Sequence, residues 1–274
     1  MLLFRSVLFQ ILFYANLVGQ LILYLPVFFL VPERWCWAIV KGWARSSLWL
    51  LRVVAGTASR IEGQERIPAG PCFVAAKHQS FWEVIALCPE VEKPTFILKK
   101  ELMRIPVFGW YASRMGMIPV DRSRRGAVLP SLLAGARKAL GEGRQIVIFP
   151  EGTRSAPGAA PNYRPGVHYL YAALGLPVVP VALNSGLFWP RQAVRRQPGT
   201  IHAEFLDPIP PGLAREPFIA ALRDRVEERS LALLKQAYAE RPDLPVSPLV
   251  AELLARHDPH PAPRHTAPEG TQGL

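Results

Sequence analysis

Short apolar runs alternate with helical patterns from about residue 60 to residue 210, and this alternation limits the choice of fold. The apolar runs predict strands at 72–76, 95–98, 115–120, 145–149, 178–183 and 200–205. Helical patterns lie between them at 81–88, 128–140 and 166–174. Strands that alternate with helices generally pair in parallel, so we expect an α/β domain with a mostly parallel sheet flanked by helices. A last helix is predicted from Pro217, at its first position, to about Tyr238.

The N-terminal segment has the composition of a membrane helix. No charged residue lies between Arg5 and Glu33, and the apolar run 7–31 is long enough to cross a hydrocarbon core at about 1.5 Å per residue. The run is too long for a cleaved signal peptide, and no small-residue cleavage site follows it. Asn16, Gln20 and Pro26 interrupt it, so a spanning helix and a helix bent into one leaflet both fit.

The segment 33–56 predicts a second, amphipathic helix. Its basic residues are spaced by seven, four and seven positions and so share one stripe, which comprises Arg34, Lys41, Arg45 and Arg52. The other side carries Ile39, Val40, Trp43, Leu50 and Val54. Such a helix could lie in the membrane interface or dock on the protein's own core. We favour the interface because the preceding segment already lies at a bilayer, so residues 1–57 are predicted to be a membrane-associated helix pair.

The end of the chain has a different composition. Prolines recur at 242, 245, 248, 259, 261, 263 and 268, which excludes a long regular element but leaves room for a short helix near 248–256. The histidines at 257, 260 and 265 could bind a metal ion weakly, although an unstructured tail explains them better. We therefore expect an α/β domain at 58–241 and a Pro-rich, largely disordered tail at 242–274.

Charge and cysteine content narrow the function. The formal net charge of +11 suits nucleic acid, an anionic membrane, phosphorylated substrates or acidic carriers, and does not choose among them. The cysteines show no CxxC and no metal-ligand spacing, so Cys72 and Cys88 are expected to be buried free thiols, and no metal site is predicted. The chain also lacks a G-x-S-x-G nucleophile elbow, a phosphate-binding G-x-x-x-x-G-K-[ST] loop and a dinucleotide-binding G-x-G-x-x-G.

His78 and Glu83, in the segment HQSFWE, are the first candidates for chemistry. Ser80 and Glu83 fit a capping box, in which Ser80 caps a helix and Glu83 reaches back to it. If the helix begins near Ser80, His78 lies in the incoming loop and can fold back toward Glu83. The carboxylate would then fix the imidazole tautomer and leave its other nitrogen free as a base. A capped helix beside an ordinary loop histidine is the alternative.

Two basic segments follow predicted strands. FPEGTRS at 149–155 lies at the carboxyl end of a strand, where ligands bind in open α/β sheets, and its Arg154 suits phosphate. The alternative is a surface turn with a salt bridge. MGMIPVDRSRR at 115–125 places Arg122 next to another strand end, and here a solvated basic loop is the alternative.

Four blocks together resemble the glycerolipid acyltransferases, and within them the 1-acylglycerol-3-phosphate acyltransferases. They are HQSFWE, GMIPVDR, FPEGTRS and VVPVAL, in the order in which the family has them. The resemblance covers about residues 60–210. The family more often has aspartate at the position of Glu83, whose longer side chain can make the same contact with His78.

The resemblance implies a membrane-bound O-acyltransferase. It would move a fatty acyl group from an acyl thioester to 1-acyl-glycerol-3-phosphate (lysophosphatidic acid) and form phosphatidic acid in phospholipid biosynthesis. His78, oriented by Glu83, would be the catalytic base. The implied substrate-binding residues are Arg122 and Arg154, which would bind the phosphate, with Glu151, Gly152 and Thr153. Glu151 would either bond glycerol hydroxyls or hold an arginine.

The resemblance also bears on partners and location. No cofactor is implied, because acyl-CoA or acyl-carrier protein would be a co-substrate. The expected partners are the phospholipid bilayer and these substrates, without nucleic acid. The expected location is the cell inner membrane, with the catalytic domain on the cytoplasmic face.

Other functions stay open at this point. The same chemistry could serve another lysolipid, such as a lyso-aminolipid or a lysophospholipid. A lipid hydrolase could use Ser80 beside His78. A non-catalytic module could gather anionic lipid through its basic stripe.

Overall fold

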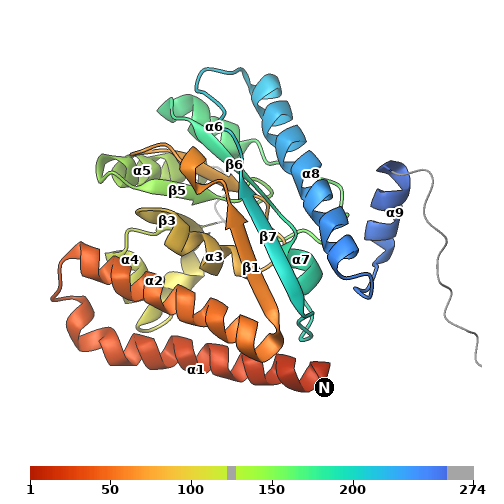
Figure 1. Cartoon of the computed structure of the whole chain (residues 1–274). Coiled ribbons are helices and arrows are strands. Elements are labelled where there is room, and N and C mark those ends of the chain that lie inside the picture. The colour runs from red at the N-terminus through yellow and green to blue at the C-terminus, as the bar shows by residue number, and fades with distance from the viewer. Residues whose placement is uncertain (122–127, 258–274) are drawn as a thin grey trace, which may run out of the picture.

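A computed structural model describes residues 1–121 and 128–257 (Figure 1). At its centre lies a seven-stranded sheet in the order β1-β7-β6-β2-β5-β3-β4. The strands are β1 Thr57–Glu62, β2 Phe73–Ala76, β3 Pro94–Lys99, β4 Ile118–Val120, β5 Gln145–Ile148, β6 Val178–Leu183 and β7 Gly199–Phe205. Among the described residues, β6 and β7 pair antiparallel and the other neighbours pair parallel. The expected mostly parallel α/β sheet is confirmed, and β1 is a strand that no apolar run predicts.

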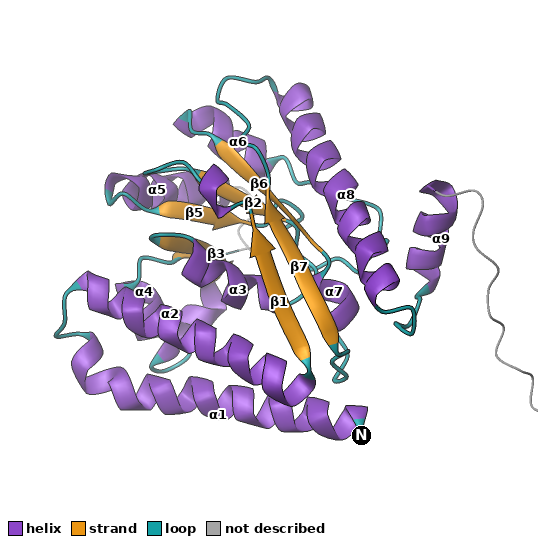
Figure 2. Cartoon of the chain, viewed as in Figure 1, coloured by secondary structure: helices purple, strands orange, loops and turns teal. Residues whose placement is uncertain are grey.

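Helices cover both faces of this sheet (Figure 2). The predicted ones are present as α3 Trp82–Glu90, α5 Val128–Gly141, α6 Gly166–Leu174, α8 Arg215–Glu240 and α9 Pro248–His257. The short helices α4 Phe108–Arg114 and α7 Ser185–Phe188 are additional. The prediction for the start of α8 is wrong by two residues, since Pro217 is its third residue and not its first. Proline is tolerated there because the first N–H groups of a helix have no partner within it.

Alternate side chains of the central strands enter two cores. On β2, Val74 and Ala76 join a core with α2 and α3, whereas Phe73 and Ala75 join a core with α5, α6 and α8. Side chains of the neighbouring strand β5 also alternate between the two cores, and Val147 enters the core with α2 and α3. Strands buried on both faces read as unbroken apolar runs, which is why the central strands are visible in the sequence.

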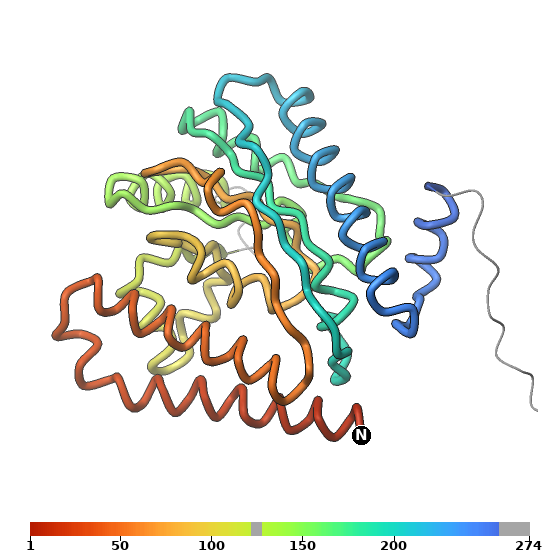
Figure 3. Tube along the Cα trace, in the orientation of Figure 1, coloured from red at the N-terminus to blue at the C-terminus, as the bar shows by residue number. Residues whose placement is uncertain are grey.

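Two N-terminal helices, α1 Leu2–Phe28 and α2 Glu33–Leu50, lie side by side along one side of the domain (Figure 3). A π-helical turn, η1 Leu51–Ala55, links α2 to β1. Apolar residues of α2 and η1 pack on the protein's own cores, namely Ile39, Val40, Trp43, Leu50 and Val54. The apolar side of α2 is therefore docked on the protein, which was the alternative to the interfacial interpretation. The reason is that α2 removes the apolar surface of the core beside α3 from water.

The described residues contain one helix apolar and long enough to cross a bilayer, α1. Only 11% of an apolar 18-residue stretch of this helix is buried, and large side chains such as Phe4, Ile22 and Leu23 are exposed. The inward side is tied to the domain along its length. Arg5 Nε donates to Val54 O at 2.7 Å, Asn16 Nδ2 donates to Ser47 Oγ at 3.1 Å, and Tyr111 OH donates to Leu21 O at 3.0 Å. Gln20 Nε2 also donates to Ser46 Oγ at 3.0 Å, so Asn16 and Gln20, two polar residues within the apolar run, face α2.

Phe13 tests whether α1 is docked in solution. Its ring is 3% exposed and contacts Trp43, Phe81 and Trp189. Phe13→Ala should lower the free energy of unfolding by about 3–5 kcal/mol, measured by denaturant titration in detergent. Phe4→Ala is the matched control, because its exposed ring should contribute no more than about 0.5 kcal/mol. Equal effects of the two substitutions would contradict docking of α1.

Candidate active site

The first candidate segment lies in the tight turn between β2 and α3. Lys77 N donates to Val181 O at 3.0 Å, which completes the sheet, and His78 then leaves it. Ser80 Oγ accepts a bond from Trp82 N at 2.8 Å, and Ser80 N donates to Glu83 Oε1 at 2.8 Å. Glu83 therefore reaches back to the N–H of Ser80, as the capping-box pattern predicts, although α3 begins two residues later, at Trp82, with Phe81 as its N-cap.

Glu83 is fully buried and has several donors around its carboxylate. Gln79 N lies 2.5 Å from Oε1, and Ser185 Oγ lies 3.1 Å from the same atom. Burial alone would raise the pKa of Glu83, but the His78 ring and the backbone N–H groups outweigh it and hold the pKa below its ordinary value. Glu83 is thus a carboxylate that the fold keeps ionised.

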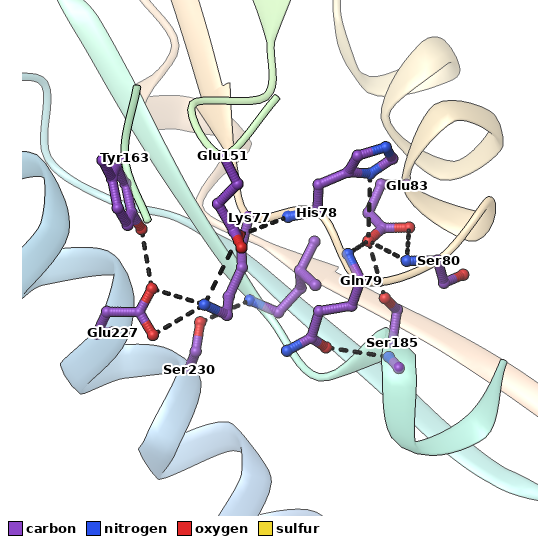
Figure 4. Close-up of polar contacts among 12 residues, drawn as sticks. Lys77, His78, Gln79, Ser80, Glu83, Glu151, Tyr163, Ser185, Glu227 and Ser230 are labelled. Carbon is purple, nitrogen blue, oxygen red and sulfur yellow. Dashed lines mark hydrogen bonds and ion pairs between the residues drawn. The ribbon is translucent and has the colours of Figure 1, made fainter. Parts of the chain in front are cut away.

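His78 stands over this carboxylate (Figure 4). Its Nδ1 lies 3.9 Å from Glu83 Oε1, which is an electrostatic contact longer than a hydrogen bond. Nδ1 is buried and has no hydrogen-bond partner among the described residues. The ring stacks on Phe149, with centroids 3.9 Å apart and planes 16° apart. Catalytic hydrogen bonds are often this long without substrate and shorten when it binds.

The second candidate segment meets the first at the carboxyl ends of β2 and β5. Ser155 N donates to His78 O at 2.8 Å, and His78 N donates to Glu151 Oε1 at 3.3 Å. Glu151 is 2% exposed, and its Oε2 is buried without a partner among the described residues. It lies beside Lys77, and among the described residues it forms no ion pair with an arginine. Gly152 has a φ of 67°, a left-handed conformation that favours glycine.

Arginines collect next to this turn. Arg191 Nη1 donates to Arg154 O at 3.2 Å and to Thr153 Oγ1 at 3.4 Å. Arg164 N donates to Pro150 O at 2.8 Å. Sequence reasoning missed Arg164 and Arg191, since neither lies in a motif. Arg122 lies outside the described residues.

His78, Glu151 and the arginines beside this turn line one cavity of about 1200 Å³. Its polar end holds His78, Glu151, Gly152, Thr153, Arg154, Arg164 and Arg191. The remainder is mainly apolar and runs toward α1, α2, α4 and β3, with Leu21, Val40, Phe81, Phe96, Phe108 and Leu132 among its walls. A histidine between an arginine-rich end and a long apolar interior suits an amphiphilic substrate with an anionic head.

Cys88 also lines the cavity, yet its thiol is no nucleophile. Burial raises the pKa of Cys88 to about 12, against a smaller opposing effect of Lys41 and Arg45, so the thiolate is scarce at neutral pH. The expectation that Cys72 and Cys88 are buried free thiols is confirmed. No group of three or more potential metal ligands occurs within 1–121 and 128–257.

Glu83→Gln should lower the free energy of unfolding by about 1–3 kcal/mol, because a neutral amide accepts weaker hydrogen bonds from the buried N–H groups than a carboxylate does. The lowered pKa of Glu83 sets the sign of the pH dependence. The carboxylate stabilises the protein fully above the unfolded value of about 4.3 and loses this effect as the pH falls through the folded value. Denaturant titration of both proteins should therefore show a difference near pH 7 that shrinks in acid. Glu228→Gln, at an exposed position, is the control. A difference independent of pH would contradict an ionised Glu83.

Comparisons with known proteins agree with this geometry. Residues 58–184 match the family model named Acyltransferase. The 1-acyl-sn-glycerol-3-phosphate acyltransferase of Pseudomonas aeruginosa is 39% identical over 163 residues, which are 60% of this chain and 63% of that protein. The chloroplastic 1-acyl-sn-glycerol-3-phosphate acyltransferase BAT2 of Brassica napus is 32% identical over 147 residues, which are 53% of this chain and 41% of that protein. The chain thus spans less than two thirds of the length of these relatives.

A solved structure has the same fold. It is the 1-acyl-sn-glycerophosphate acyltransferase PlsC of Thermotoga maritima, with a TM-score of 0.72 and 23% identity, covering 85% of this chain and 98% of that one. The resemblance seen in the four sequence blocks is confirmed by these matches. Residues 58–184 of the chain are therefore similar to the acyltransferase family in sequence, and the chain has the fold of one of its solved members.

Proposed function

We propose that this chain is a membrane-bound acyltransferase that moves a fatty acyl group from an acyl thioester to lysophosphatidic acid and forms phosphatidic acid. One observation carries the proposal. His78, paired with buried Glu83, stands where an arginine-rich mouth meets an apolar cavity of about 1200 Å³. The names of the relatives support the choice of acceptor.

The reaction needs a base and no covalent enzyme intermediate. His78 Nε2 takes the proton of the acceptor hydroxyl as its oxygen attacks the acyl carbon of the thioester. The carbon–sulfur bond then breaks, and the thiolate leaves with a proton from the imidazolium. Glu83 stabilises that imidazolium by its charge. A hydrolase built on Ser80 does not fit, because Ser80 is fully buried and its Oγ already accepts a hydrogen bond from Trp82 N.

The acceptor would bind through its phosphate. Arg154 supplies a fixed cation at the mouth, and Arg164 and Arg191 place two more guanidinium groups there. Arg122, outside the described residues, remains a predicted fourth. Glu151 Oε2, buried and without a partner among the described residues, would accept a bond from a glycerol hydroxyl, and Gly152 and Thr153 would shape the pocket around it.

The chain would work at a bilayer, with α1 as the membrane element. The exposed apolar side of α1 supports contact with lipid, and the net charge of +11 suits an anionic surface. We assign residues 1–57 to this membrane-associated part, in which α1 meets the lipid and α2 packs on the domain, 58–241 to the catalytic domain and 242–274 to the tail. The expected location is the cell inner membrane with the domain on the cytoplasmic face, where acyl-CoA or acyl-carrier protein would be the donor.

His78→Ala should reduce turnover by about 10²–10⁴-fold without unfolding the protein, because the residue lies in a loop and acts as the base. The assay follows transfer from long-chain acyl-CoA, and separately from acyl-carrier protein, to lysophosphatidic acid in detergent. His257→Ala is the control, since His257 is exposed on α9. Normal turnover by His78→Ala would overturn the mechanism.

The same assay with a phosphate-free lysolipid tests the acceptor. Equal rates on both acceptors would move the substrate to another lysolipid and keep the mechanism. No transfer by the wild type from either donor would favour the non-catalytic membrane module.

Arg154→Ala should raise the KM for lysophosphatidic acid by about 10- to 100-fold, the equivalent of a charge-assisted hydrogen bond of about 1.5–3 kcal/mol. The KM for the acyl donor should stay the same, because the lost charge faces the acceptor. Arg225→Ala, at an exposed position on α8, is the matched control. Initial rates at varied acceptor concentration give both constants. An unchanged acceptor KM would show that Arg154 does not bind the phosphate.

A further inference from the structure

Lys77, the residue before His78, is almost completely buried. Its side chain is 6% exposed, and its Nζ lies 2.6 Å and 2.8 Å from the two carboxylate oxygens of Glu227 on α8. Tyr163 OH donates to the same carboxylate at 3.0 Å. Lysines are rarely buried unless paired, because removing an ammonium group from water costs several kcal/mol. A contact between α8 and the sheet alone could be made by apolar side chains at lower cost.

The other neighbour of Lys77 belongs to the candidate active site. Glu151 Oε1 lies 3.7 Å from Lys77 Nζ and 3.3 Å from His78 N (Figure 4). One carboxylate oxygen is therefore placed between the lysine and the backbone of the proposed base. The second oxygen, Oε2, has no partner among the described residues, although Glu151 lines the cavity.

The charges explain why a cation is needed at this point. Glu151 and Glu227 come from different elements and both approach the same Nζ. Two carboxylates that share one ammonium group repel each other, more strongly because Glu151 is buried, and Lys77 compensates both charges. Without it, the His78 N–H would be the one donor left to the Glu151 carboxylate among the described residues, and the side chain would be free to turn away. Lys77 does not line the cavity, so it acts through Glu151 and does not touch substrate.

We propose that Lys77 is a positioning residue for acyl transfer: it holds the Glu151 carboxylate against the His78 backbone and keeps Glu151 Oε2 available to the acceptor hydroxyl. This rests on the proposed function. A lysine that serves only as a bridge to α8 would have the same contacts with Glu227, so the test must separate the two roles.

Three single variants separate them. Lys77→Met should lower kcat by up to about 10²-fold, as expected for a misplaced acceptor group, with the KM for the acyl donor unchanged. Lys77→Arg keeps the cation and should recover part of kcat. Glu227→Gln weakens the bridge but leaves the cation beside Glu151, so its kcat should stay close to that of the wild type.

A double-mutant cycle shows whether the effect passes through Glu151. Lys77→Met combined with Glu151→Gln should be no slower than the slower single variant, because both changes remove the same interaction. If Lys77→Met does not fold, Lys77→Met/Glu227→Gln is measured in its place. It neutralises Glu227, one of the two carboxylates that lose their cation in Lys77→Met. It should melt close to the wild type while its kcat stays low.

Three results would overturn the role of Lys77: an unchanged kcat in Lys77→Met, an equal loss in Glu227→Gln, or additive losses in the cycle with Glu151→Gln. Recovery of kcat in Lys77→Met/Glu227→Gln would do the same, since only the bridge would then matter. The wild-type rate is read separately. A wild type that acylates another lysolipid changes the acceptor alone, and the ratios are then measured with that lysolipid. A wild type that acylates none overturns both proposals.

Discussion

The arrangement of the candidate site depends on a carboxylate with no access to water. Glu83 is fully buried, and its charge is tolerated because Gln79 N, Ser80 N and Ser185 Oγ donate to it. Two of these donors are backbone groups of the turn between β2 and α3, so the chain must reverse there in one particular way. That reversal brings the His78 ring over Glu83. The position of the proposed base thus follows from the hydrogen bonds that its buried partner, Glu83, receives from the protein.

Part of the fold could be predicted because burial leaves a trace in sequence. β2 and β6 are apolar throughout, and β5 is apolar after its first residue, Gln145, since both faces of these strands are covered. β1 escaped prediction because only its first residue is buried, and its sequence TASRIE carries no such run. For α2, a helical period of apolar residues cannot distinguish lipid from the protein's own core. The docked helix was therefore visible as an amphipathic helix but assigned to the wrong surroundings.

The site follows the same rule. His78 and Glu83 are five positions apart, so a local turn pattern was enough to predict that their side chains meet. Lys77 and Glu227 are separated by 150 positions, and Arg191 is 38 positions from Thr153, so no spacing pattern reports either contact. Such pairs depend on which strand ends meet and which helix crosses them, and this is decided by the whole sheet.

The pairing of β1 with β7 has a consequence for synthesis. Thr57 Oγ1 donates to Gln197 O, 140 residues further along, and β1 pairs in register with β7 from Thr57 to Glu62. On the ribosome, β1 therefore emerges long before its partner exists, whereas α1, made earlier still, already presents its apolar side. The growing chain would meet a bilayer through α1 while its sheet is still open at β1. β1 therefore pairs late, after most of the chain has been made.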